Sequence, residues 1–72
     1  MNPKEAKKLL NLFKRFRKCM KLYSKVSKQL YSKKFKKLTE NEKYLIIQEH
    51  LILSSLKDNL EHQISIFQTD NN

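Results

Sequence analysis

Two histidines and one cysteine are the residues of this 72-residue chain best suited to hold a metal ion or act as a nucleophile. His50 and His62 are twelve residues apart, and Cys19 is distant from both in the sequence. Structural zinc sites use about four Cys or His ligands grouped in local pairs, so this spacing argues against a metal site. We interpret both histidines as surface or partly buried residues.

Cys19 is the remaining candidate nucleophile. It is close in sequence to Arg17, Lys18 and Lys21, and nearby cations favour the reactive thiolate form of a cysteine. No predicted neighbour supplies a general base, and a lone cysteine beside Met20 on a helix most often behaves as a small packing residue. We therefore expect Cys19 to pack rather than react.

Other catalytic motifs are also missing from the sequence. The chain has no glycine for a nucleotide-binding loop and no paired carboxylates with a predicted cleft to hold them. The sequence therefore predicts a protein that is not an enzyme and that binds no cofactor directly.

Charge divides the chain into two unlike halves. Residues 1–38 contain fourteen Lys or Arg and one acid, a net charge of +13, whereas residues 39–72 contain two lysines and six acids, a net charge of −4, which together give +9. A block this basic usually meets an anionic nucleic acid, membrane surface or protein. A merely solvated face accounts for a few lysines but poorly for this excess.

The length of the chain limits its core. A domain of this size buries only about 60% of the surface that its unfolded form exposes, and a single cysteine cannot close an intrachain disulfide. We therefore expect association with a partner to support the fold. No stretch approaches the roughly 18 apolar residues of a membrane span, and no secretory signal pattern is evident. The basic, acid-poor N-terminal segment resembles a mitochondrial targeting helix, which favours the mitochondrial matrix or a mitochondrion-derived organelle over the cytoplasm.

Helices are the expected elements, because the chain contains no glycine and one proline. Asn2, Pro3 and Glu5 predict a helix start, with an N-cap, a first-turn proline and a capping-box acid. Spacings of three and four residues then predict one apolar stripe. Its members are Ala6, Leu9, Phe13, Phe16, Met20 and Tyr23.

A second helical stretch is predicted over residues 25–37, either continuous with the first or bent from it at Ser24 or Ser27. Thr39 and Glu42 form a second capping box, which marks the start of a third helix. The apolar stripe of that helix consists of Ile46, Leu53, Leu56, Leu60, Ile64 and Phe67. Its first half is apolar nearly all round, so part of this surface is expected to face a partner or a bound apolar group.

The sequence thus predicts a single all-α domain over residues 1–72, with three helices in an antiparallel arrangement. The polar residues 68–72 are expected to fray at its end.

The segment Leu12-Phe13-Lys14 resembles the Leu-Tyr-Arg motif near the start of the small mitochondrial helical proteins of the LYR family. Lys18 falls where the family commonly has a second arginine. Lys21 and the residues after it look like the continuation in the family's cysteine-desulfurase accessory member, which is the most similar member.

The resemblance extends from residue 9 to residue 67, and residues 60–66 look like the C-terminal segment of that accessory member. The chain departs from the family pattern at Phe13, in place of tyrosine, and at Lys14, in place of arginine. Lysine cannot reproduce the planar, two-pronged contact of arginine. The chain is also shorter than the family between the second and third helices.

The resemblance implies a non-catalytic accessory subunit that binds and stabilises a cysteine desulfurase, together with acyl carrier protein, in iron–sulfur cluster assembly. The ligand it implies is the acyl-phosphopantetheine group of the carrier, whose acyl chain would insert among the helices. The partner-binding residues implied are Leu12, Phe13, Lys14, Lys18, Lys21, Lys33, Lys34, Lys36 and Lys37. The apolar interface or acyl-chain contact implied consists of Phe16, Met20, Leu53, Leu56, Leu60 and Ile64.

Two other functions fit parts of the sequence. A small RNA-binding or ribosome-associated protein would use the basic half, with aromatic rings to stack on unpaired bases. The aromatic residues of the first helix belong to its apolar stripe, however, so packing explains them better. A membrane-surface helix over residues 4–23 would suit the basic and apolar faces, but it leaves the acidic last helix unexplained.

Overall fold

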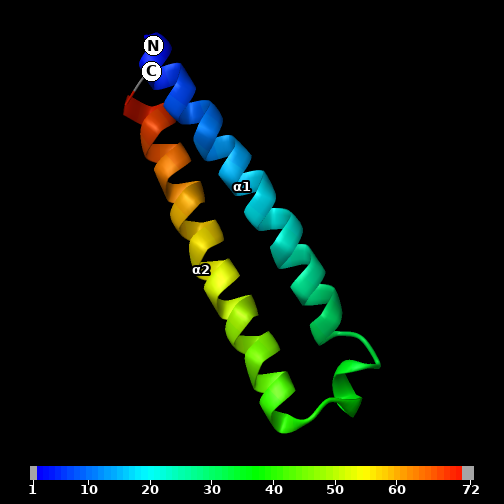
Figure 1. The fold of residues 1–72 in the computed structure, drawn as a ribbon. Coiled ribbons are helices and arrows are strands. Elements are labelled where there is room, and N and C mark those ends of the chain that lie inside the picture. Colours follow the sequence, from blue (N-terminus) through cyan, green and yellow to red (C-terminus); the bar gives the residue numbers. More distant parts are fainter. Residues whose placement is uncertain (1, 71–72) are drawn as a thin grey trace.

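The protein is a helical hairpin, seen in a computed structural model that describes residues 2–69 and the backbone of residue 70 (Figure 1). Helix α1 (Pro3–Leu30) and helix α2 (Glu40–Asp70) lie antiparallel, joined by a connection that contains the short 3-10 helix η1 (Phe35–Lys37). The hairpin measures 52 × 15 × 14 Å. The all-α prediction is confirmed, whereas the predicted three-helix arrangement is wrong.

The predicted second helix over residues 25–37 does not form as a unit. Its first six residues continue α1 to Leu30, so the first two predicted helices are continuous up to that point. The Ser32 hydroxyl then donates to the Gln29 carbonyl oxygen at 2.8 Å and accepts from the Phe35 N–H at 3.3 Å. A serine hydroxyl competes with helical hydrogen bonds in this way, which explains why the helix ends here.

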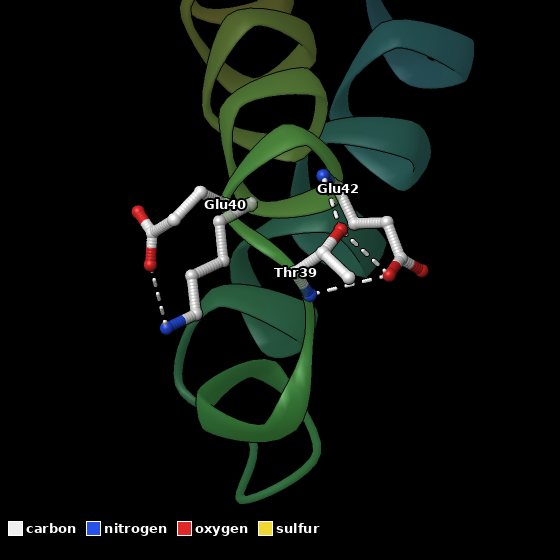
Figure 2. Close-up of polar contacts among 4 residues, drawn as sticks. Thr39, Glu40 and Glu42 are labelled. Carbon is white, nitrogen blue, oxygen red and sulfur yellow. Dashed lines mark hydrogen bonds and ion pairs between the residues drawn. The ribbon is translucent and has the colours of Figure 1, made fainter.

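Both predicted helix starts are confirmed. At the start of α1, the Asn2 side-chain oxygen accepts from the Glu5 N–H at 2.8 Å. Before α2, the Thr39 hydroxyl accepts from the Glu42 N–H at 3.2 Å, and the Glu42 carboxylate accepts from the Thr39 N–H at 3.2 Å (Figure 2). The carboxylate also accepts from the Thr39 hydroxyl at 2.9 Å. These hydrogen bonds from Thr39, the side-chain bond first, lower the pKa of Glu42.

The two helices pack along one seam whose residues recur at alternating spacings of three and four, the pattern of a coiled coil. Each seam residue is buried or half-buried. In α1 they are Glu5, Leu9, Leu12, Phe16, Cys19, Tyr23, Val26 and Leu30. In α2 they are Lys43, Ile46, His50, Leu53, Lys57, Leu60, Ile64 and Phe67. Helix α2 runs through the first three residues of the predicted frayed tail, and Asn71 and Asn72 lie outside the described residues.

The predicted stripe of α1 is rotated relative to this seam. Phe13 and Met20 lie beside the seam, and Met20 is 37% exposed, whereas its neighbour Cys19 is 3% exposed. Residues seven apart lie on the same face of the helix. Phe13 and Met20 are followed at this spacing by the polar Ser27, whereas Cys19 is followed by the apolar Val26. Burying Cys19 and Val26 therefore gives a longer apolar contact with α2.

A polar layer interrupts the seam near its middle. The ring of His50 stacks on that of Tyr23, and its Nε2 lies 3.0 Å from the Ser27 hydroxyl oxygen. The Lys57 ammonium lies 5.7 Å from the centre of the Tyr23 ring, within cation–π distance, and 3.3 Å from an Asp58 carboxylate oxygen. The hydrogen bond to Asp58 raises the pKa of Lys57. Neither His50 nor Lys57 was predicted from the sequence to lie in the helix contact.

Candidate docking surface

The cations of α1 gather on the part of the helix that α2 does not cover. We call nine of them the basic face: Lys4, Lys7, Lys8, Lys14, Arg15, Lys18, Lys21, Lys25 and Lys28. All nine are exposed. Across the described part of the chain, the ion pairs within 4 Å join Lys43 to Glu40 and Lys57 to Asp58, so none involves the basic face. No described carboxylate therefore forms an ion pair with the basic face.

A shallow depression lies at the centre of the basic face. It has a volume of about 380 Å³, and no carboxylate or aromatic ring lines it. Its lining residues are Lys14, Arg15, Arg17, Lys18 and Lys21. Five cations that share one concave surface concentrate positive potential there, and the aliphatic parts of their side chains give the surface some apolar character.

A second, larger groove of about 600 Å³ runs between the two helices toward the open end of the hairpin. The basic residues Lys8 and Arg15 border it on α1, and the apolar residue Ile66 borders it on α2. The remaining lining residues are Glu5, Asn11, Leu12, Gln63 and Phe67. The groove therefore combines cationic and apolar groups and is open to solvent.

This groove shows which residues of the two helices share a side. Arg15 directly precedes the seam residue Phe16, and Gln63 directly precedes the seam residue Ile64. In an antiparallel pair, residues at such equivalent heptad positions lie on the same side of the hairpin. We call this the groove side. Besides part of the basic face, it carries the exposed apolar residues Leu22, Leu45, Ile52, Leu56 and Ile66.

The opposite side consists of two positions for each of six seam residues: the residue directly after it and the residue two positions before it. The six seam residues are Leu12, Cys19, Val26, Ile46, Leu53 and Leu60. No lysine of either helix falls at these positions, so we call it the lysine-free side. Its large apolar residues are Leu10, Phe13, Met20, Tyr44, Ile47 and Leu51. Five of them are exposed, and Phe13 is half-buried.

The structure brings together three of the predicted partner-binding lysines and separates the others from them. Lys14, Lys18 and Lys21 line the central depression. The predicted cluster of Lys33, Lys34, Lys36 and Lys37 is exposed at the closed end of the hairpin, in the connection (Figure 1). Nine helical residues separate Lys21 from the end of α1, a distance of about 14 Å at 1.5 Å per residue.

The three residues of the predicted Leu12-Phe13-Lys14 motif belong to three different surfaces. Leu12 packs against the core of the seam, Phe13 is half-buried on the lysine-free side, and Lys14 is exposed on the basic face. Of the three, Lys14 alone lies on the basic face.

The predicted acyl-chain contact is also divided. Leu53, Leu60 and Ile64 are buried in the seam, and Phe16 packs against the same core. Met20 and Leu56 are 37% and 41% exposed, but they lie on opposite sides of the hairpin. These six residues therefore do not line one cavity in the hairpin.

The groove contains residues that the sequence analysis did not select. Lys8, Arg15, Gln63 and Ile66 lie far apart in the sequence and meet because α1 and α2 are antiparallel. The heptad spacing of both helices, considered together, could have predicted the groove, because residues that precede equivalent seam positions lie on the same side of the hairpin. Treating each helix separately could not reveal it.

The structure also places the three residues that were first considered as metal ligands or nucleophiles, Cys19, His50 and His62. Cys19 is buried, and its thiol donates to the Leu53 carbonyl oxygen at 3.5 Å, so its predicted packing role is confirmed. His50 is half-buried and His62 is exposed, as expected. Within the described residues, no three His, Cys, Asp or Glu side chains are grouped to hold a metal ion. Neither described helix is long and apolar enough to cross a membrane.

The fold and surface therefore define a basic helical hairpin whose exposed cations form a candidate docking surface. Comparison of the chain with models of known families, with curated proteins and with solved structures found no match. The resemblance to the LYR family stays a prediction.

Proposed function

We propose that this protein is a non-catalytic binding subunit that docks through its basic face and groove side onto an acidic, amphipathic surface of a partner protein. The observation that carries the proposal is the charge of the basic face, which no ion pair among the described residues offsets. Four cations of the basic face share one depression with Arg17, and no carboxylate lines it. Cations without an ion pair attract an anionic partner over about 8 to 10 Å at ordinary ionic strength.

The apolar residues beside the basic face favour a protein over a nucleic acid. Leu22, Ile52 and Leu56 are 49%, 65% and 41% exposed on the groove side. Phosphate contacts alone would leave these side chains uncovered, whereas the apolar face of a partner helix would cover them. The central depression also lacks the aromatic rings on which unpaired bases stack.

An acidic amphipathic helix matches this surface best. Its apolar residues would contact the exposed leucines and isoleucines of the groove side, and its carboxylates would meet Lys8 and Arg15 at the groove. Arginine suits such a contact, because its guanidinium binds a carboxylate with two parallel hydrogen bonds. In this arrangement the partner supplies the helix that the two-helix hairpin lacks.

A more specific form of the proposal rests on the family resemblance. The partner would then be acyl carrier protein, and the complex would stabilise a cysteine desulfurase for iron–sulfur cluster assembly in a mitochondrion or a mitochondrion-derived organelle. The acidic carrier suits the basic face. The acyl chain would need space other than the seam, because Leu53, Leu60 and Ile64 already fill it.

Affinity capture tests the proposal at the level of partner class. The tagged chain is purified from an extract treated with nuclease, and the bound proteins are eluted with increasing salt and identified. The proposal expects an acidic protein that stays bound to the tagged chain after nuclease treatment and is released by salt. A cysteine desulfurase and a carrier protein among the bound proteins would support the specific form. Ribosomes or RNA that are bound in an untreated extract and lost after nuclease treatment would contradict both forms.

A further inference from the structure

The hairpin exposes more surface than a protein of its mass normally does. Its accessible surface is 6092 Å² for 8.7 kDa. The usual scaling of surface with mass gives about 4,700 Å² for a folded monomer of this size. One seam between two helices leaves much of each helix uncovered, and eleven large apolar residues of the described part of the chain are consequently exposed.

The lysine-free side carries most of the apolar residues that the proposed docking surface does not use. Leu10 and Met20 on α1 are 58% and 37% exposed. On α2, Tyr44, Ile47 and Leu51 are 61%, 42% and 56% exposed. Half-buried Phe13 adds to the surface, which extends from near the open end of the hairpin to its closed end.

Charge distinguishes the possible occupants of this side. The charged residues at the positions of this side are Arg17, Asp58 and Glu61, a net charge of −1, whereas the whole chain carries +9. Two copies that meet through their lysine-free sides keep their basic faces apart. Contact through the groove side would instead bring the basic faces together, and closely opposed like charges disfavour that contact.

We propose that two copies of this chain associate through their lysine-free sides to form a four-helix bundle, leaving both basic faces free for the acidic partner. Two separate hairpins expose 12,184 Å², twice 6092 Å². A compact protein of twice the mass exposes about 7,900 Å², so closing the bundle buries at most about 4,300 Å² in total. Obligate homodimers bury about 2,000 to 5,000 Å², so this upper limit lies within the range of a stable dimer. The proposal does not depend on the identity of the acidic partner.

Sedimentation equilibrium of the full chain tests this proposal. The wild-type protein is expected at twice 8.7 kDa. Leu51→Asp places a charge on the lysine-free side and is expected to raise the dimer dissociation constant at least about tenfold, or 1.4 kcal/mol. The matched control is Ile52→Asp, the same change at the next residue, which is 65% exposed on the groove side, compared with 56% for Leu51. It is expected to remain a dimer, and Leu10→Asp on α1 is expected to behave like Leu51→Asp.

Several outcomes would overturn the proposal. A wild-type mass of 8.7 kDa at every concentration would do so, as would equal effects of Leu51→Asp and Ile52→Asp or a larger effect of Ile52→Asp. If the Leu51 and Leu10 variants lose their helical circular dichroism, the wild-type melting temperature decides. A dimer required for folding gives a melting temperature that rises with protein concentration, and a constant value over a wide concentration range contradicts it.

Discussion

The imidazole of His50 stacks on the phenol ring of Tyr23, with ring centroids 4.7 Å apart and planes inclined by 28°. The contact joins α2 to α1 at the middle of the hairpin, where Ser27 and Lys57 complete a polar layer. A polar position in an otherwise apolar helical seam favours one register, because a shifted register would leave its polar groups without partners. The layer therefore favours the register in which the two helices are aligned along the seam.

Replacing His50 tests the contribution of this layer. We expect His50→Ala to lower the free energy of unfolding by about 1 to 3 kcal/mol, since it removes an aromatic contact and a hydrogen bond. Chemical denaturation followed by circular dichroism measures the change. His62→Ala is the matched control, because His62 is exposed on the same helix and should change stability little. Equal effects at the two positions would contradict a role for the stack.

The Thr39–Glu42 capping box predicts both a mutational and a pH effect. Thr39→Ala is expected to destabilise the hairpin by about 1 kcal/mol, the usual value for an N-cap. The Glu42 pKa is lowered on folding, so its contribution is present above the ordinary glutamate value of about 4.3 and is lost as the pH falls through the lowered value. The stability difference between wild type and Thr39→Ala should therefore narrow in acid, and a part should remain because the Thr39 hydroxyl still accepts from the Glu42 N–H.

A second threonine provides the control for that prediction. Thr69 donates to the Ser65 carbonyl oxygen within α2 and is exposed, so Thr69→Ala should leave both the stability and its pH dependence nearly unchanged. If the stability difference between wild type and Thr39→Ala were the same at every pH, the hydrogen bonds to the Glu42 carboxylate would not be its source.

The Cys19 thiol should report on the opening of the seam. Because Cys19 is 3% exposed, we expect its reaction with a thiol reagent to be at least about tenfold slower than that of an exposed thiol, limited by local opening. The matched comparison is Cys19→Ala/Met20→Cys, which moves the thiol by one residue to a position that is 37% exposed in the wild type. Equal rates for the two proteins would contradict the seam described for α1.

The sequence predicted features that depend on local hydrogen bonding and failed where two helices had to be considered together. Asn2 and Thr39 could be predicted as helix starts because an N-cap needs only a hydrogen bond to a residue three positions later in the sequence, and both bonds form. Cys19 and Met20 both border apolar positions, and which of them is buried depends on the partner helix. The groove between Arg15 and Ile66 depends on how α1 and α2 pair. The end of α1 depends on one hydroxyl, that of Ser32.

Salt dependence tests whether the basic face contributes electrostatically to partner binding. Exposed charges are screened within about 10 Å at 0.1 M ionic strength and within about 3 Å at 1 M. The affinity for the captured partner should therefore fall steadily as salt is added, with the larger change in the association rate. An affinity that is constant across this range would mean that the exposed apolar residues of the groove side account for binding without the lysines.

The most direct test of the docking surface compares two double charge reversals by calorimetric titration with the captured partner. Lys14→Glu/Lys18→Glu and Lys36→Glu/Lys37→Glu each change two cations to two acids, so both take the net charge from +9 to +5. The first pair lies in the central depression and the second at the closed end of the hairpin. Docking through the basic face predicts at least about a tenfold loss of affinity for the first pair, equal to 1.4 kcal/mol, and a much smaller loss for the second. Equal losses would mean that binding follows net charge alone, and a larger loss for the second pair would place the docking surface on the connection instead.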